Sequence, residues 1–184
     1  PAARMLILRE EIHRERLGIM RSTDEFAVAQ KRLLQDALTD TLTQLPNRRN
    51  GLDFLASEWV FSQSSGSPLA CLMLDIDHFK RINDQHGHER GDQALQLLAA
   101  ALRTLSRQQD YLARLGGDEF VLAARDRNAT GLASLAQRLQ GYLQEHCAPG
   151  SAPIELSIGI ADNTRQTTDD LLRLADQALY QGKQ

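Results

Sequence analysis

A run of six apolar residues, from Leu69 to Leu74, is the feature that most limits how this chain can fold. No polar residue interrupts the run, which is typical of a β-strand with both faces buried. Such a strand belongs inside a sheet that helices cover. The run ends in the acidic sequence Asp75-Ile76-Asp77, so we expect carboxylates at the end of this strand, beside whatever elements lie next to it.

Composition narrows the class of protein. The chain has 184 residues, 42% of them hydrophobic and 24% charged, a balance typical of one globular domain with a short extension. The net charge of −3 argues against a nucleic-acid polymer as partner, because that mode of binding needs clustered Lys and Arg. Two cysteines imply no disulfide framework. No apolar run approaches the roughly 20 residues of a membrane-spanning helix.

The first 39 residues are predicted to form one long helix, which we treat as a region separate from residues 40–184. Apolar residues recur there at seven-residue intervals, the spacing of a coiled-coil seam: Met5, Ile12, Ile19, Phe26 and Leu33. The second set of coiled-coil positions, three residues after each of these, is mostly polar. Two interpretations of the helix are therefore open, a parallel dimer stalk and a helix packed on its own domain. The chain starts at Pro1 without a signal-peptide pattern. We therefore interpret it as a cytoplasmic fragment of a longer protein.

The remaining pattern predicts an α+β fold with a central, mostly antiparallel sheet and helices around it, close to the split βαβ arrangement. Two strands, 111–115 and 119–124, are joined at Gly116-Gly117, because paired glycines accept the positive φ angles of a tight hairpin turn. The other expected elements are helices over about 46–63, 78–84, 93–105 and 130–146, a strand over about 154–161 and a last helix from 168. The helix over 93–105 is expected to follow a turn region at Gly87 and Gly91.

Acidic residues on two separate segments are candidates for metal binding: Asp75 after the buried strand, and Asp118-Glu119 at the hairpin. Mg²⁺ is a hard cation that takes oxygen ligands and leaves positions for substrate phosphates. Each group alone is weak evidence, since the hairpin acids also suit an ordinary solvated turn. We assign Asp77 to capping the helix over 78–84 rather than to the metal.

Several motifs together resemble one known family. The hairpin sequence RLGGDEF, residues 114–120, is similar to the signature of the GGDEF family, the diguanylate cyclases. The family's other motifs follow in its order: DTLTQLPNRR at 40–49, LDIDHFKRIND at 74–84, GHERGD at 87–92, SIGIA at 157–161 and ADQALY at 175–180. The resemblance covers about residue 38 to the last residue.

This resemblance implies a polymerase-palm-like, nucleotidyl-cyclase-like fold. It also implies an enzyme that joins two GTP molecules into cyclic di-GMP and releases two pyrophosphates. The family's metal ligands fall on Asp75, the main-chain carbonyl of Ile76, and Asp118, with Glu119 close by; the expected metal is Mg²⁺, with Mn²⁺ as the alternative. Asp118 is also the candidate acceptor of the 3′-hydroxyl proton, and Glu119 is counted with it among the catalytic residues.

The resemblance places guanine recognition on Asn83 and Asp92, with His88 between them in the same pocket. A carboxylate suits guanine, whose edge offers two adjacent N–H donors. Without the resemblance, Asn83 would be interpreted as a helix C-cap and Asp92 as the N-cap of the helix over 93–105.

Phosphate binding is expected at the helix start formed by His78, Phe79 and Lys80, where main-chain N–H groups can face an anion. Lys80 adds a positive charge and is counted with the catalytic residues. Lys183 matches a second phosphate-binding lysine of the family.

The sequence RQQD, residues 107–110, is similar to the family's RxxD inhibitory site. It predicts feedback inhibition by cyclic di-GMP through Arg107 and Asp110, with Arg138 as a further contact. By itself this pair would be a surface ion pair of little energy.

The expected active species of the enzyme is a homodimer with facing sites. The alternative function is that of a non-catalytic receptor for GTP or cyclic di-GMP.

Overall fold

The structure is a computed structural model, and it describes residues 25–26, 28–30, 34–35, 37–147, 154–163 and 171–182. The chain divides into two units, Pro1–Leu38 and Thr39–Gln184. In the first unit all the described residues are helical, and Phe26 is exposed. The other four members of the predicted seam lie outside the described residues, so the dimer stalk stays a prediction.

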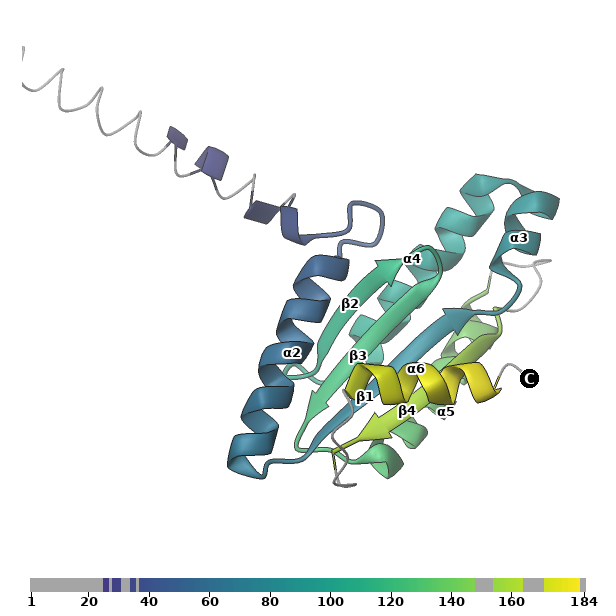
Figure 1. The fold of residues 1–184 in the computed structure, drawn as a ribbon. Coiled ribbons are helices and arrows are strands. Elements are labelled where there is room, and N and C mark those ends of the chain that lie inside the picture. Colours follow the sequence, from purple (N-terminus) through teal and green to yellow (C-terminus); the bar gives the residue numbers. More distant parts are fainter. Residues whose placement is uncertain are drawn as a thin grey trace, which may run out of the picture. The chain divides into compact units, whose positions relative to one another are not determined.

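The second unit contains the predicted strands and helices (Figure 1). They are α2 (Arg48–Ser65), β1 (Leu69–Ile76), α3 (Phe79–His86), α4 (His88–Leu105), β2 (Tyr111–Gly116), β3 (Glu119–Arg125), α5 (Ala129–His146), β4 (Leu156–Asp162) and α6 (Leu171–Gly182). One boundary was predicted wrongly. Helix α4 begins at His88 and includes Gly91, and only Gly87 lies outside the helices between α3 and α4, with φ 82°.

The four strands form one sheet in the order β2-β3-β1-β4, and every neighbouring pair is antiparallel. The predicted fold class is confirmed. Strand β1 lies in the interior of the sheet, and all eight of its residues are buried. The predicted two-sided burial of the apolar run is therefore correct, and it extends to Asp75 and Ile76.

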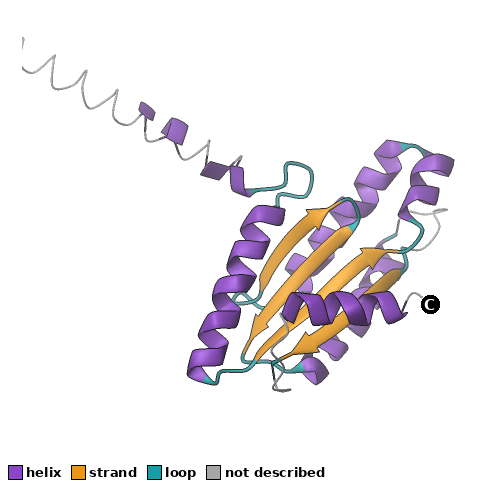
Figure 2. Ribbon diagram, in the orientation of Figure 1, coloured by secondary structure: helices purple, strands orange, loops and turns teal. Residues whose placement is uncertain are grey.

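Helices cover both faces of the sheet (Figure 2). Alternate side chains of β1 contribute to two cores because successive strand residues point to opposite faces. Leu72 and Leu74 pack with α4 and α5, whereas Cys71 and Met73 pack with α2 and α6. Within the described ranges, no helix is long and apolar enough to cross a membrane.

The hairpin between β2 and β3 turns at Gly116 and Gly117, with φ of 134° and 54°. Both values lie where a side chain would be strained, so the predicted use of paired glycines is confirmed. The turn lies at the same end of the sheet as the end of β1 (Figure 1). The acids after the glycines are thereby brought to the acidic end of the buried strand.

Candidate active site

Carboxylates from two strands are paired across the sheet. Asp75 of β1 lies directly opposite Glu119 of β3 in the antiparallel register. Side chains alternate along a strand, so both carboxylates share the face of Met73 and Val121. Residues in such a position have Cβ atoms about 4.5–5.5 Å apart. The predicted convergence of acids from two separate segments is therefore present.

Two further residues with oxygen donors, Asp118 and Ile76, are adjacent in the sequence to this pair. Asp118 is half-buried in the turn immediately before Glu119, and Ile76 ends β1 one residue after Asp75. Among the described residues, no three His, Cys, Asp or Glu side chains gather closely enough to hold a metal ion by themselves. The three expected carboxylates, Asp75, Asp118 and Glu119, therefore form no such group on their own, and the expected ligand set also needs the main-chain carbonyl of Ile76.

Asp77 does not cap α3, contrary to the sequence prediction. The N-cap residue is His78, and no side chain caps the helix there. Asp77 instead accepts a hydrogen bond at Oδ1 from Ser157 Oγ of β4, at 2.5 Å, and its main-chain N–H donates to the carbonyl of Glu155, at 2.9 Å. These bonds join the end of β1 to β4, so the role of Asp77 in the structure is to hold this loop.

The start of α3 has the form expected of an anion site. His78 adopts a left-handed conformation, with φ 56° and ψ 29°, which is uncommon for a residue other than glycine. The first N–H groups of a helix have no partner within the helix, and here they belong to Phe79 and Lys80. The side chains of His78 and Lys80 are exposed, whereas Phe79 packs against the core. Lys183 lies outside the described residues.

Helices α3 and α4 bring the predicted guanine-binding residues to neighbouring positions. Asn83 is half-buried in α3, and a Cβ built on Gly91 of α4 would lie only 2.0 Å from its Oδ1. His88 and Asp92 are exposed on the first turns of α4. The capping interpretations are wrong: the C-cap of α3 is Gly87, and Asp92 lies inside α4.

The predicted inhibitory motif is arranged differently from a surface ion pair. The side chain of Asp110 is fully buried, and its Oδ2 accepts the main-chain N–H of Arg107 at 2.8 Å. The same oxygen lies 3.7 Å from Nη2 of Arg127. Arg107 and Arg138 are both exposed. The ion pair of Asp110 therefore involves a residue that the motif did not indicate.

Three contacts near the hairpin were also not predicted. Arg114 joins Asp40 to the carbonyl of Gly117, and Ser157 supports Asp77. The motifs contain all these residues, but neither their spacing nor their type says which of them meet. One signal in the sequence could have indicated the contact of Arg114 with Gly117. An arginine placed shortly before the two glycines is long enough to donate a hydrogen bond to the main chain of the turn.

Comparison with known proteins shows which family the chain belongs to. The family described as "Diguanylate cyclase, GGDEF domain" matches residues 37–184. The chain belongs to the GGDEF family. GGDEF diguanylate cyclases generally use a divalent metal ion.

Curated relatives of this GGDEF domain include proteins named as cyclases. The chain is 39% identical over 153 residues to diguanylate cyclase DgcP of Pseudomonas aeruginosa, covering 81% of this chain and 23% of that protein. It is 33% identical over 171 residues to a diguanylate cyclase of Vibrio cholerae, covering 91% and 53%. The chain thus spans about half or less of the length of these relatives.

Solved structures agree with the fold. The coiled coil and GGDEF domain of DgcB from Caulobacter crescentus, in complex with c-di-GMP, superposes with a TM-score of 0.80 at 26% identity, covering 89% of this chain and 90% of that one. Diguanylate cyclase SiaD of Pseudomonas aeruginosa, in complex with its activator SiaC, gives 0.73 at 29% identity, covering 97% and 73%.

Proposed function

We propose that this protein is a diguanylate cyclase, which condenses two GTP molecules into cyclic di-GMP and releases two pyrophosphates. The observation that carries the proposal is the pairing of Asp75 with Glu119, next to Asp118, at the end of the sheet where the hairpin turns. Membership of the GGDEF family and the names of the relatives support the same reaction.

The residues at this point suit a divalent cation. Asp75, Asp118 and Glu119 supply carboxylate oxygens, and Ile76 supplies a main-chain carbonyl, so the donors are the hard oxygen ligands that Mg²⁺ prefers. Mn²⁺ is the alternative metal. When bound, such an ion would neutralise phosphate charge and favour ionisation of the attacking hydroxyl.

The chain's own residues bind and orient the nucleotide. Asn83 and Asp92 read the adjacent N–H donors of guanine from α3 and α4, and His88 lines the same pocket. The phosphates lie over the start of α3, where N–H groups of the first turn and the Lys80 ammonium face them.

The reaction requires two domains. The 3′-hydroxyl oxygen of each GTP forms a bond to the α-phosphorus of the other, the bond between that phosphorus and the β-phosphate oxygen breaks, and pyrophosphate leaves. The hydroxyl proton passes to the Asp118 carboxylate. Each domain holds one GTP, so a two-fold homodimer with facing sites is the active species. Feedback by cyclic di-GMP would act through Arg107, Asp110 and Arg138.

The test is product analysis by chromatography after incubation with Mg²⁺ and either GTP or ATP. We expect cyclic di-GMP from GTP alone, and Asp118→Asn should lower turnover by about 100-fold or more. Asp126→Asn is the matched control, because Asp126 is exposed and follows the opposite end of β3. Nucleotide binding without any product would contradict the proposal and indicate a receptor instead.

A further inference from the structure

The turn that carries the acids is weakly constrained by its own backbone. Gly116 and Gly117 both have positive φ, and glycine has more conformational freedom than any other residue. The β2–β3 register also shifts between Arg114 and Gly116. Contacts from outside the turn are therefore needed to hold Asp118 and Glu119 in one arrangement.

Arg114 supplies such a contact through the edge of its guanidinium. Its Nε and Nη2 donate hydrogen bonds to the carbonyl oxygen of Gly117, at 3.2 and 2.7 Å. The carbonyl of Gly117 and the N–H of Asp118 belong to one planar peptide group. Fixing the direction of that carbonyl therefore fixes the plane from which Asp118 begins.

Asp40 holds the other side of the same guanidinium. Arg114 Nη1 donates to both carboxylate oxygens of Asp40, at 3.0 and 3.1 Å. Asp40 Oδ1 also accepts from the N–H and Oγ1 of Thr43, at 2.9 and 2.6 Å. Burial raises the pKa of Asp40, but the hydrogen bonds from Thr43 and Arg114 outweigh it, so the pKa lies below its ordinary value. The carboxylate is thus ionised at neutral pH.

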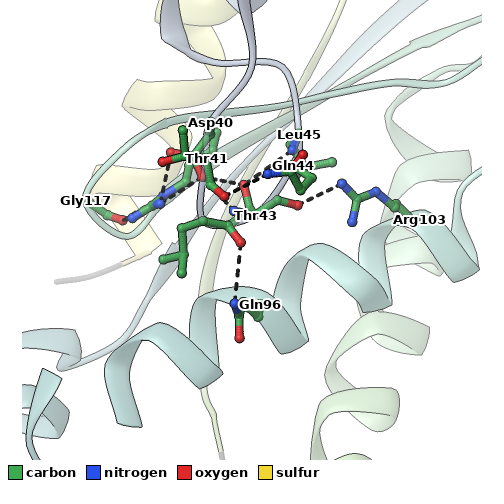
Figure 3. Close-up of polar contacts among 10 residues, drawn as sticks. Asp40, Thr41, Thr43, Gln44, Leu45, Gln96, Arg103 and Gly117 are labelled. Atoms are coloured by element: carbon green, nitrogen blue, oxygen red, sulfur yellow. Dashed lines mark hydrogen bonds and ion pairs between the residues drawn. The ribbon is translucent and has the colours of Figure 1, made fainter. Parts of the chain in front are cut away.

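The loop that contains Asp40 is itself fixed to the sheet and to α4 (Figure 3). Arg103 Nη2 of α4 donates to the carbonyl of Thr43 at 2.7 Å, and the N–H of Arg114 donates to the carbonyl of Pro46 at 2.9 Å. Thr43 is 2% exposed. The support of the hairpin is therefore a loop anchored at buried Thr43 and at Pro46.

We propose that Asp40 and Arg114 are positioning residues for the hairpin acids Asp118 and Glu119. The inference rests on the proposed cyclase activity. A series of hydrogen bonds links the Asp40 carboxylate to the Arg114 guanidinium and the guanidinium to the Gly117 carbonyl. Loss of these bonds should free the turn without changing the guanine-binding residues. A displacement of about 1 Å at a reacting group costs about 100-fold in rate.

Asp40→Asn and Arg114→Lys test the proposal in the full chain. The first variant keeps the size of the side chain and removes its charge, and the second keeps the charge and removes the planar fork. Both should lower kcat by about 10- to 100-fold while the KM for GTP changes by about twofold or less. NMR order parameters of the Gly117 and Asp118 amides should fall from about 0.85 to about 0.6 or below.

Glu58→Gln is the matched control. It removes a second buried carboxylate that is paired with an arginine, Arg125, at the opposite end of β3 from the hairpin. Its kcat and order parameters should equal those of the wild type. A folded Asp40→Asn protein with wild-type kcat and order parameters overturns the proposal, as does an equal loss in Glu58→Gln. If the wild type makes no cyclic di-GMP, the proposed function fails, and the order parameters still decide the positioning role.

Discussion

Gly159→Ala offers a sharp test of the packing of α6 on the sheet. Gly159 lies in β4 opposite Met73 of β1. A Cβ at this position would lie 2.0 Å from the carbonyl oxygen of Ala175, 2.5 Å from the main-chain nitrogen of Leu179 and 2.9 Å from its Cα. All three atoms are backbone atoms of α6, so no side chain can rotate to make room.

The cost follows from how far the helix must move. Real Cβ contacts stay beyond 3.0 Å, so α6 must shift by about 1 Å and loosen the packing of Leu171, Ala175 and Leu179 in the core. Overpacking usually lowers the free energy of unfolding by about 1–3 kcal/mol. Because the neighbouring atoms here are rigid backbone atoms, we expect a loss of about 3 kcal/mol or more. For a chain of this size the midpoint of thermal unfolding should fall by about 6–12 °C.

Thermal unfolding followed by circular dichroism measures this shift. Gly141→Ala is the control, because Gly141 lies in α5 and a Cβ there meets nothing within 4 Å. That variant should gain about 0.5–1 kcal/mol, since alanine favours helix over glycine. The two Gly→Ala changes should therefore have opposite signs. A Gly159→Ala protein as stable as the wild type would refute the inference that α6 packs directly on the β4 backbone.

Three further predictions concern other parts of the domain. Gly91→Ala should displace the Asn83 amide and raise the KM for GTP by about 10-fold in steady-state assays, with a smaller change in kcat. The pKa of Asp40 is lowered in the fold, so the ionised carboxylate stabilises the folded protein fully above about pH 4, and this stabilisation is lost as the pH falls through the lowered pKa. Asp40→Asn should remove that part of the acid dependence of the free energy of unfolding, measured by urea titrations between about pH 3 and 7. A thiol reagent should label half-buried Cys147 in the folded protein, and buried Cys71 only after unfolding.

Local patterns in the sequence predicted most of the fold. The strand at Leu69–Leu74 was evident because six adjacent apolar residues suit burial on both faces, and the hairpin because Gly116 and Gly117 both need positive φ. The start of α4 was misplaced, since Gly91 was interpreted as a turn residue. Its small size, rather than its flexibility, is what the structure uses, because α3 and α4 approach closely at this residue.

The candidate site was harder to predict in detail. The motifs indicated which acids converge, and the register of Asp75 with Glu119 agrees. Motifs could not indicate the partners of Asp77 or Asp110, because those partners, Ser157 and Arg127, come from other strands and loops. Such pairs depend on how distant segments are placed relative to each other, and no local propensity encodes that placement.

The central place of β1 has a consequence for synthesis on the ribosome. Its two neighbours are β3, about 50 residues later in the chain, and β4, about 90 residues later. A nascent chain therefore exposes its most apolar segment with both edges unpaired until Glu119–Arg125 has emerged, and with one edge unpaired until Leu156–Asp162 has emerged. This segment is where holdase chaperones should bind, and truncation before β4 should give aggregation rather than a smaller folded domain.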